Sequence, residues 1–180
     1  MDNFKKQAVR LGADVRYGLI TKVDFSQRPF VCIADESKTI LAQTVIIATG
    51  ASAKWLGIPS EQRLNGSGVS ACAVCDGFFY RGKDVAIVGA GDTACEEASY
   101  LAKLCTKVHM IVRRDEFRAS KAMQHRVLNT PNIVVHFNSE TDEILGDQVV
   151  TGVRIKNNVD QSTKEIEVSG FFVAIGHIDP

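Results

Sequence analysis

Two cysteines separated by two residues, Cys72 and Cys75, are the side chains of this sequence best suited to chemistry. Two intervening residues let the thiols close a small-loop disulfide, and free backbone N–H groups stabilise a thiolate near the start of a helix. A C-x-x-C pair beside a βαβ pattern is typical of redox-active thiols in cytosolic proteins. The pair therefore predicts thiol–disulfide exchange.

Half of a structural zinc site is the main competing interpretation, and an inert buried pair is the other. Structural zinc needs four ligands at characteristic spacing. The sequence has no second C-x-x-C, and its four histidines lie far apart, at positions 109, 125, 136 and 177. We therefore predict no metal site. The remaining cysteines lie in apolar surroundings and are expected to be small buried hydrophobes: Cys32, Cys95 and Cys105.

Asp76 directly follows the second thiol of the pair. A carboxyl group in a partly apolar site can protonate or deprotonate the reaction partner of a dithiol. A solvated Asp that caps a helix would look the same in the sequence. Position alone therefore leaves an acid–base role and a capping role open.

A glycine-rich turn follows a strand-like run that ends at Val88. It reads GAGDTA, a G-x-G-x-x-A fingerprint. The first glycine permits the tight strand-to-helix turn, the second lets a pyrophosphate approach the backbone, and the small third residue lets helix and strand pack closely. The helix start also offers free N–H groups to phosphates. The fingerprint predicts a dinucleotide site, against a merely tight turn, at Gly89, Gly91, Asp92, Thr93 and Ala94.

Three arginines indicate which dinucleotide to expect. NAD-binding proteins usually place an acidic residue at the end of the second strand, but here that strand is followed by Arg113 and Arg114, with Arg118 four residues on. Guanidinium groups bind phosphate through two parallel hydrogen bonds. The arginines favour NADPH over NADH, with a solvated surface cluster as the alternative.

The elements around these motifs indicate an α/β fold. Strand-like and helix-like runs alternate in the order Asp84–Val88, Asp92–Lys103, Lys107–Val112, Ser120–Leu128 and Ile133–Phe137. Such crossovers make the strands parallel. Three later runs predict an antiparallel meander: Glu140–Leu145, Val149–Lys156 and Glu165–Val168.

The N-terminal part has a different pattern. Residues 4–11 predict an amphipathic helix closed by Gly12. Short strand-like runs follow and predict an antiparallel meander: Asp14–Leu19, Thr21–Phe25, Phe30–Ile33 and Lys38–Leu41.

Two apolar runs that end in glycine, Thr44–Gly50 and Phe171–Gly176, flank the βαβ block. Each is typical of a fully buried strand. We predict that both belong to an outer domain into which the block is inserted, with linkers near residues 51–56 and 167–170. The outer domain would then be incomplete, which makes a fragment of a longer protein the expectation.

Composition excludes several classes. Hydrophobic residues make up 45% of the 180 residues, and 21 Lys and Arg balance 21 Asp and Glu. A zero net charge gives no reason to expect a nucleic-acid partner. No apolar run approaches the roughly 20 residues that span a bilayer, and the first residues lack the apolar core of a signal peptide. We expect a cytoplasmic protein without membrane or nucleic-acid partners.

In combination, the stretches CAVCDG, VGAGDTACEE, VRRDEFRASK and GFFVAIGH, with IIATGASAKWLGIPSE upstream, resemble the low-molecular-weight thioredoxin reductases. The resemblance covers nearly the whole chain. It implies a homodimeric flavoprotein in which an NADPH-binding domain interrupts an FAD domain. It also implies that Cys72 and Cys75 are the redox disulfide, and that Asp76 is the acid–base group.

The same resemblance implies roles for further residues. Arg113, Arg114 and Arg118 would hold the 2′-phosphate, and Val23, Thr49 and Gly50 would face FAD. Ile175 and Gly176 are further candidates for NADPH contact. The N-terminal G-x-G-x-x-G of the family and its C-terminal flavin segment are absent, so we expect this chain not to hold FAD firmly.

The predicted fold is a Rossmann-like three-layer α/β NADPH domain, residues 54–168, inserted into a split and incomplete FAD/NAD(P)-binding domain, residues 1–53 and 169–180. The predicted function is NADPH-dependent reduction of thioredoxin, with electrons passing through FAD and the Cys72–Cys75 disulfide. A peroxiredoxin-reducing flavoprotein subunit and a stand-alone NADP-binding module without turnover are the alternatives.

Overall fold

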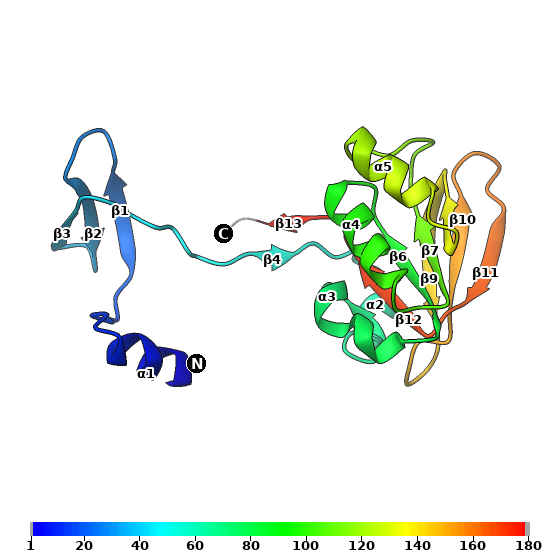
Figure 1. The fold of residues 1–180 in the computed structure, drawn as a ribbon, viewed down its shortest axis with the longest axis horizontal. Helices are drawn as coiled ribbons and strands as arrows, with labels where there is room; N and C mark the ends of the chain where they lie inside the picture. Colours follow the sequence, from blue (N-terminus) through cyan, green and yellow to red (C-terminus); the bar gives the residue numbers. More distant parts are fainter. Residues whose placement is uncertain (1, 179–180) are drawn as a thin grey trace. The chain divides into compact units, whose positions relative to one another are not determined.

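The computed structural model describes residues 2–178, and the chain divides into two compact units between residues 49 and 50. The described part of the first unit contains α1 (Asp2–Arg10), β1 (Ile20–Asp24), β2 (Phe30–Ala34) and β3 (Lys38–Ala42) (Figure 1). The strands pair antiparallel in the order β1-β2-β3, which confirms the predicted meander. The run Asp14–Leu19 forms no strand, so that prediction is wrong; no described strand pairs with it.

The first unit has almost no core. Among its described apolar side chains only Cys32 and Ala34 are buried, and α1 buries none. The predicted buried strand Thr44–Gly50 is wrong, because this run has no regular structure and Ile46 and Ile47 are 91% and 71% exposed. A buried strand needs neighbours that accept its backbone hydrogen bonds, and no described strand lies beside this run.

The second unit is built on a five-stranded parallel sheet in the order β5-β12-β6-β7-β8. Its strands are β5 (Val69–Ser70), β12 (Gly170–Val173), β6 (Asp84–Val88), β7 (Lys107–Ile111) and β8 (Ile133–His136). Helices α4 (Asp92–Leu101) and α5 (Lys121–Leu128) make the crossovers. The predicted βαβαβ order is confirmed, with ends within one or two residues of those expected.

Three layers enclose two cores (Figure 1). Along β6, Val85 and Ile87 pack on the helix side, whereas Ala86 and Val88 pack toward a second sheet. That sheet is the antiparallel meander β9 (Ser139–Leu145), β10 (Gly152–Asn157) and β11 (Thr163–Glu167). Alternation of apolar residues to both faces explains why β6 is a continuous apolar run. The predicted three-layer α/β class is confirmed.

The placement of the last apolar run corrects the predicted topology. Strand β12 pairs in parallel with β6, Phe171 opposite Ala86, and so lies in the same sheet as the glycine-rich turn. Its two phenylalanines, Phe171 and Phe172, are fully buried there. The sequence assigned this run to the outer domain, whereas its strand pairs within the sheet of the βαβαβ block, because an apolar run does not reveal which strands pair with it.

The predicted linker at 167–170 is also wrong. Val168 is buried, and the Ser169 N–H donates to the Asp84 carbonyl at 2.8 Å. The chain leaves the five-stranded sheet after Ala174, and β13 (His177–Ile178) then pairs antiparallel with β4 (Ser52–Ala53). The limits of the cofactor-binding domains (1–53, 54–168 and 169–180) remain predictions.

The segment from residue 51 to 68, which includes the linker predicted near residues 51–56, contains β4 and a short helix, α2 (Pro59–Arg63). Glu61 on α2 is only 1% exposed, and its carboxylate accepts hydrogen bonds from the backbone N–H groups of Leu56 and Gly57, both at 2.9 Å. These bonds satisfy the buried charge and fix the entry into the unit. No helix among residues 2–178 has the length and apolar character needed to cross a membrane.

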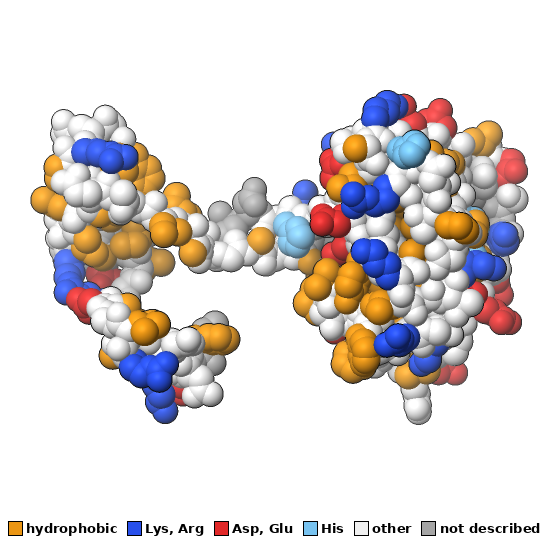
Figure 2. Space-filling view, in the orientation of Figure 1, with side chains coloured by type: hydrophobic (Ala, Val, Ile, Leu, Met, Phe, Trp, Pro, Cys, Tyr) orange, Lys and Arg blue, Asp and Glu red, His pale blue; other side chains and the backbone are white. Residues whose placement is uncertain are grey.

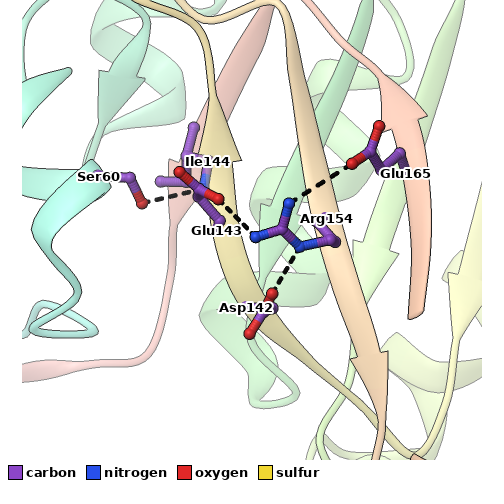
Figure 3. A network of polar contacts seen from close by, with 6 residues as sticks. All are labelled: Ser60, Asp142, Glu143, Ile144, Arg154 and Glu165. Carbon is purple, nitrogen blue, oxygen red and sulfur yellow. Dashed lines mark hydrogen bonds and ion pairs between the residues drawn. The ribbon is translucent and has the colours of Figure 1, made fainter. Parts of the chain in front are cut away.

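A polar network stabilises the meander (Figure 3). Arg154 on β10 binds Asp142 and Glu143 on β9 at 2.6 and 2.5 Å, and Glu165 on β11 at 3.5 Å. The Ile144 N–H donates to the buried Ser60 hydroxyl at 3.0 Å, which ties α2 to the meander. One guanidinium group therefore holds the three strands in register.

Two histidines far apart in the sequence meet on the meander face of the sheet. His109 Nδ1 and His136 Nε2 are 3.0 Å apart, and the rings stack with centroids 5.3 Å apart. Burial lowers the pKa of His136 to about 4, and His109 and Lys164 act in the same direction. The sequence missed this pair because strand register brings it together. No three His, Cys, Asp or Glu side chains of residues 2–178 are grouped as metal ligands.

The histidine pair predicts a pH-dependent stability. The pKa of His136 is lower in the folded chain than in the unfolded chain. Its contribution to the free energy of unfolding is therefore fully present above about pH 6.5 and is lost as the pH falls toward 4. His136→Gln should reduce this loss by on the order of 2 kcal/mol, measured by urea unfolding at several pH values. The exposed His125 on α5 provides the control, and an equal effect of His125→Gln would contradict the assignment.

Candidate functional site

The C-x-x-C pair forms a disulfide at the start of a short helix. Cys72 is the N-cap of α3 (Ala73–Asp76), its Cα lies 5.3 Å from that of Cys75, and the two sulfurs are bonded. The Cys75 N–H donates to Cys72 Sγ at 3.2 Å, and the Cys72 N–H donates to the Ser70 hydroxyl at 3.0 Å. Cys75 is exposed and Cys72 is half-buried. The predicted helix-start position of the thiols is confirmed.

Asp76 stands at the N-cap position of a 3₁₀ helix, but its side chain does not cap that helix. It ends α3 and precedes the 3₁₀ helix η1 (Gly77–Tyr80), and its side chain makes no capping hydrogen bond. Burial raises the pKa of Tyr80, and the nearby Asp76 carboxylate raises it further. The capping alternative is therefore wrong, and an acid–base role stays a prediction.

The three other cysteines are inert in the way the sequence predicted. Cys32, Cys95 and Cys105 are buried and unbonded. Burial raises the pKa of Cys95 and of Cys105 to about 11. Since the thiolate is the reactive form, only the Cys72–Cys75 pair is suited to exchange.

The glycine-rich turn is closely packed at its first glycine. A Cβ on Gly89 would lie 2.3 Å from the Ala174 carbonyl oxygen and 2.7 Å from the Ala94 Cβ, and its φ is +149°. Real Cβ atoms do not approach a backbone oxygen so closely, so the position requires glycine. The fully buried Ala94 lets α4 lie close against this turn. Both features were predicted from the fingerprint.

The second glycine leaves open space. Gly91 is the N-cap of α4, and nothing lies within 4 Å of the position that its Cβ would occupy. It contributes no side chain to cap the helix, so the first N–H groups of α4, at Asp92, Thr93 and Ala94, have no side-chain cap. Open space beside unpaired N–H groups fits a phosphate group.

The arginine-bearing loop after β7 is tied to the glycine-rich turn. The N–H groups of Arg118 and Ala119 donate to the Ala90 carbonyl at 2.8 and 3.0 Å. The Ser120 hydroxyl and N–H donate to Asp92 at 2.7 and 3.0 Å, and the hydroxyl bond is the main cause of the lowered pKa of that carboxyl group. Asp92 therefore positions the loop through its side chain, a role that the fingerprint does not reveal.

Arg113 and Arg114 stand on a fixed backbone. The Asn158 side chain donates to the Arg113 carbonyl, and the Asn138 N–H donates to the Arg114 carbonyl, both at 3.0 Å. Together with Arg118, both arginines are exposed, and none of the three forms an ion pair with a carboxylate of residues 2–178. Three uncompensated guanidinium groups beside a phosphate cradle fit an anionic ligand.

The end of β12 completes this edge of the sheet. The Ala174 N–H donates to the Val88 carbonyl at 2.9 Å, so Ile175 and Gly176 follow directly beside the Gly89 turn. The strand order reverses between β12 and β6, which makes this edge a topological switch point, where open α/β sheets bind ligands. Parallel pairing thus brings Ile175 and Gly176 to the site.

The candidate flavin residues form no site. Val23 is exposed on β1, whereas Thr49 and Gly50 lie in an exposed stretch without regular structure. Exposed side chains do not enclose a flavin, so the described residues do not fit that group. Their predicted contact with FAD stays untested.

Comparison with known proteins agrees with the geometry. A family model described as pyridine nucleotide-disulphide oxidoreductase matches residues 4–179. The chain belongs to this family. The resemblance seen in the motifs is therefore confirmed.

Individual relatives are similar to this chain over nearly its whole length. It is 46% identical over 181 residues to a thioredoxin reductase of Vibrio cholerae, covering 98% of this chain and 57% of the relative. A glucosaminate ammonia-lyase of Pseudomonas fluorescens is also 46% identical, with 98% and 56% covered. A thioredoxin reductase structure from Giardia duodenalis superposes with a TM-score of 0.84 at 45% identity, with 98% and 58% covered. The chain spans little more than half of each.

The two glycines of the turn predict a large and a small effect of the same substitution. Gly89→Ala should lower the free energy of unfolding by about 3 kcal/mol, because the added methyl group meets the Ala174 backbone. Gly91→Ala should change it by less than about 1 kcal/mol, since Gly91 has φ −87° and open space around it. Urea unfolding followed by circular dichroism measures both, and equal losses would contradict this packing.

Proposed function

We propose that this oxidoreductase takes electrons from NADPH and delivers them, through its Cys72–Cys75 disulfide, to the disulfide of thioredoxin. The observation that carries the proposal is the presence of a nucleotide cradle and an accessible disulfide on one unit, joined by α4. The N-terminus of α4 adjoins the cradle, and its Leu101 lies 3.0 Å from the Cβ position of Gly77, just after the disulfide helix.

NADPH is the proposed nucleotide because of Arg113, Arg114 and Arg118. A 2′-phosphate adds about two negative charges, and exposed guanidinium groups without ion-pair partners in the described chain can bind it through parallel hydrogen bonds. NADH lacks that phosphate, so the three arginines would have no phosphate group to bind. The pyrophosphate would lie on the N–H groups of Asp92 and Thr93.

A protein is the proposed electron acceptor because the disulfide lies in an apolar surface. Next to the exposed Cys75, the side chains of Val74, Phe78 and Phe79 are 65%, 63% and 70% exposed. Figure 2 shows apolar side chains gathered over α3 on the larger unit. Exposed apolar side chains that gather in this way mark protein-binding surfaces. Thioredoxin reductases among the relatives make thioredoxin the proposed partner.

In the proposed exchange, a Cys72 or Cys75 thiolate attacks the partner disulfide, the partner bond breaks, and the remaining thiolate resolves the mixed disulfide. The N–H of Cys75 stabilises charge on Cys72 Sγ. FAD is the carrier that the family supplies between nicotinamide and disulfide. The described residues do not fit it, so we assign them no flavin contact beyond the untested candidates.

Homodimer formation, a cytoplasmic location and the acid–base role of Asp76 remain parts of this proposal. A peroxiredoxin-reducing subunit would use the same disulfide with another partner, and a nucleotide-binding module would exchange no thiols. The ammonia-lyase relative carries a different named reaction. Release of ammonia from glucosaminate by this chain would favour that reaction over thiol exchange.

The arginine cluster predicts nucleotide selectivity. Arg114→Ala should weaken NADPH binding roughly tenfold, the loss of about 1.4 kcal/mol expected for one charged hydrogen-bonding group, and leave NADH binding unchanged. Isothermal titration calorimetry of both nucleotides checks this. Arg126→Ala, on the exposed side of α5, is the matched control. Equal affinity of the unaltered chain for NADH and NADPH would overturn the choice of nucleotide.

The cysteine pair predicts that the reduced chain transfers electrons to thioredoxin without any nucleotide. The chain, reduced with dithiothreitol and desalted, should reduce thioredoxin at a rate that falls by more than about a hundredfold in Cys72→Ser and in Cys75→Ser. Alkylation and mass spectrometry count the thioredoxin thiols formed. Cys105→Ser, which removes a buried thiol, is the control. If both the Cys72→Ser and the Cys75→Ser chains reduced thioredoxin at the unaltered rate, the redox role of the pair would be refuted.

A further inference from the structure

One carboxyl group lies on the buried face of α4, against the disulfide helix. Ala94, Ala98 and Leu101 are fully buried on this helix, and residues three and four positions apart share one face. Glu97 stands three residues after Ala94 and four before Leu101, within this apolar face. The next residue back, Glu96, is exposed.

The disulfide helix packs directly on that face. Ala73, which follows Cys72 in the chain, is fully buried in the same core cluster as Ala94 and Ala98. The backbone amide of Ala73 interacts with the Glu97 carboxyl group. Glu97 therefore lies at the start of α3, where Cys72 is the N-cap.

The carboxyl group is not fully satisfied. Glu97 Oε2 is buried without a hydrogen-bond partner among residues 2–178, a condition shared only with Thr141 Oγ1 in that part of the chain. A buried, unpaired carboxylate oxygen is costly, and a proton removes that cost. Burial raises the pKa of Glu97; the Ala73 amide and His177 oppose this, and Glu96 reinforces it.

The surrounding charges also matter for the pH dependence. His177 on β13 and Glu96 on α4 lie near enough to act on Glu97, and they change its pKa in opposite directions. Asp76, at the other end of α3, acts on Tyr80. Glu97 is thus the carboxyl group at the Cys72 end of the disulfide helix, and Asp76 is the one at the Cys75 end.

We propose that Glu97 holds the proton that Cys72 takes up when the disulfide is reduced. This inference rests on the proposed redox function of the cysteine pair. A thiolate of a dithiol reductant attacks Cys75 Sγ, the S–S bond breaks, and its electron pair goes to Cys72 Sγ. Glu97 gives its proton to the Cys72 thiolate and becomes a carboxylate. The second thiol of the reductant then attacks the mixed disulfide as a thiolate and releases Cys75. Of the two protons that the reductant loses, one goes to Cys75 and the other to solvent, so Glu97 remains a carboxylate after reduction.

Two negative charges at the start of α3 repel each other, so Cys72 and Glu97 should titrate as a coupled pair. In the Cys75→Ser chain, the rate of Cys72 alkylation by iodoacetamide should therefore rise with pH in two steps. Adding Glu97→Gln should leave a single step, with its midpoint about one pH unit lower, because the carboxylate no longer opposes the thiolate. Adding Glu96→Gln should preserve both steps. One identical step in all three chains would overturn the proposal.

Infrared difference spectroscopy of the chain with all its cysteines provides a second test, in which the unaltered chain alone can overturn the proposal. Reduction of the disulfide should change the absorbance of a protonated carboxyl group, and Glu97→Gln should abolish that change. A reduced-minus-oxidised spectrum of the unaltered chain without such a band would overturn the proposal. If that spectrum lacks the band but the chain still reduces thioredoxin, only the proposed role of Glu97 is wrong. If the chain does not reduce thioredoxin, the proposed function itself is wrong.

Discussion

The close contact of β6, β12 and α4 at Gly89 is the constraint on which the candidate site depends. The absence of a side chain there lets the chain turn from strand into helix while the Ala174 backbone passes beside it. This packing fixes the start of α4 at the switch point of the sheet. It therefore decides where the free N–H groups of the helix point, and where the ends of β7 and β12 stand in relation to them.

Helix α4 connects two kinds of chemistry. Its N-terminus borders the nucleotide cradle, and Asp92 in its first turn holds the arginine loop through Ser120. Its buried face carries the disulfide helix, where small side chains, Ala94 and Ala98, permit close packing. A displacement of this one helix would alter the phosphate cradle and the surroundings of the disulfide together. Because both sites rest on the same rigid element, their relative placement within the unit is fixed.

Much of the site could be predicted because its functional motifs consist of residues that are close in the sequence. The G-x-G-x-x-A turn, the C-x-x-C pair and the arginines after β7 each act through residues close in sequence, so spacing alone identifies them. The contribution of Asn158 to the position of Arg113, and the burial of Glu97, could not be predicted. Both arise from contacts between segments that only the folded chain brings together.

The sequence by itself determined the βαβαβ order, the two meanders and the residue types of both candidate sites, because hydrophobic period and turn chemistry are local properties. Only the tertiary structure decided that β12 joins the sheet of β6, that the run Thr44–Gly50 stays exposed, and that His109 meets His136. An apolar run indicates that a strand is buried between neighbours, but not which strands those neighbours are. Strand register and sheet order, set by packing across the whole unit, supply that information.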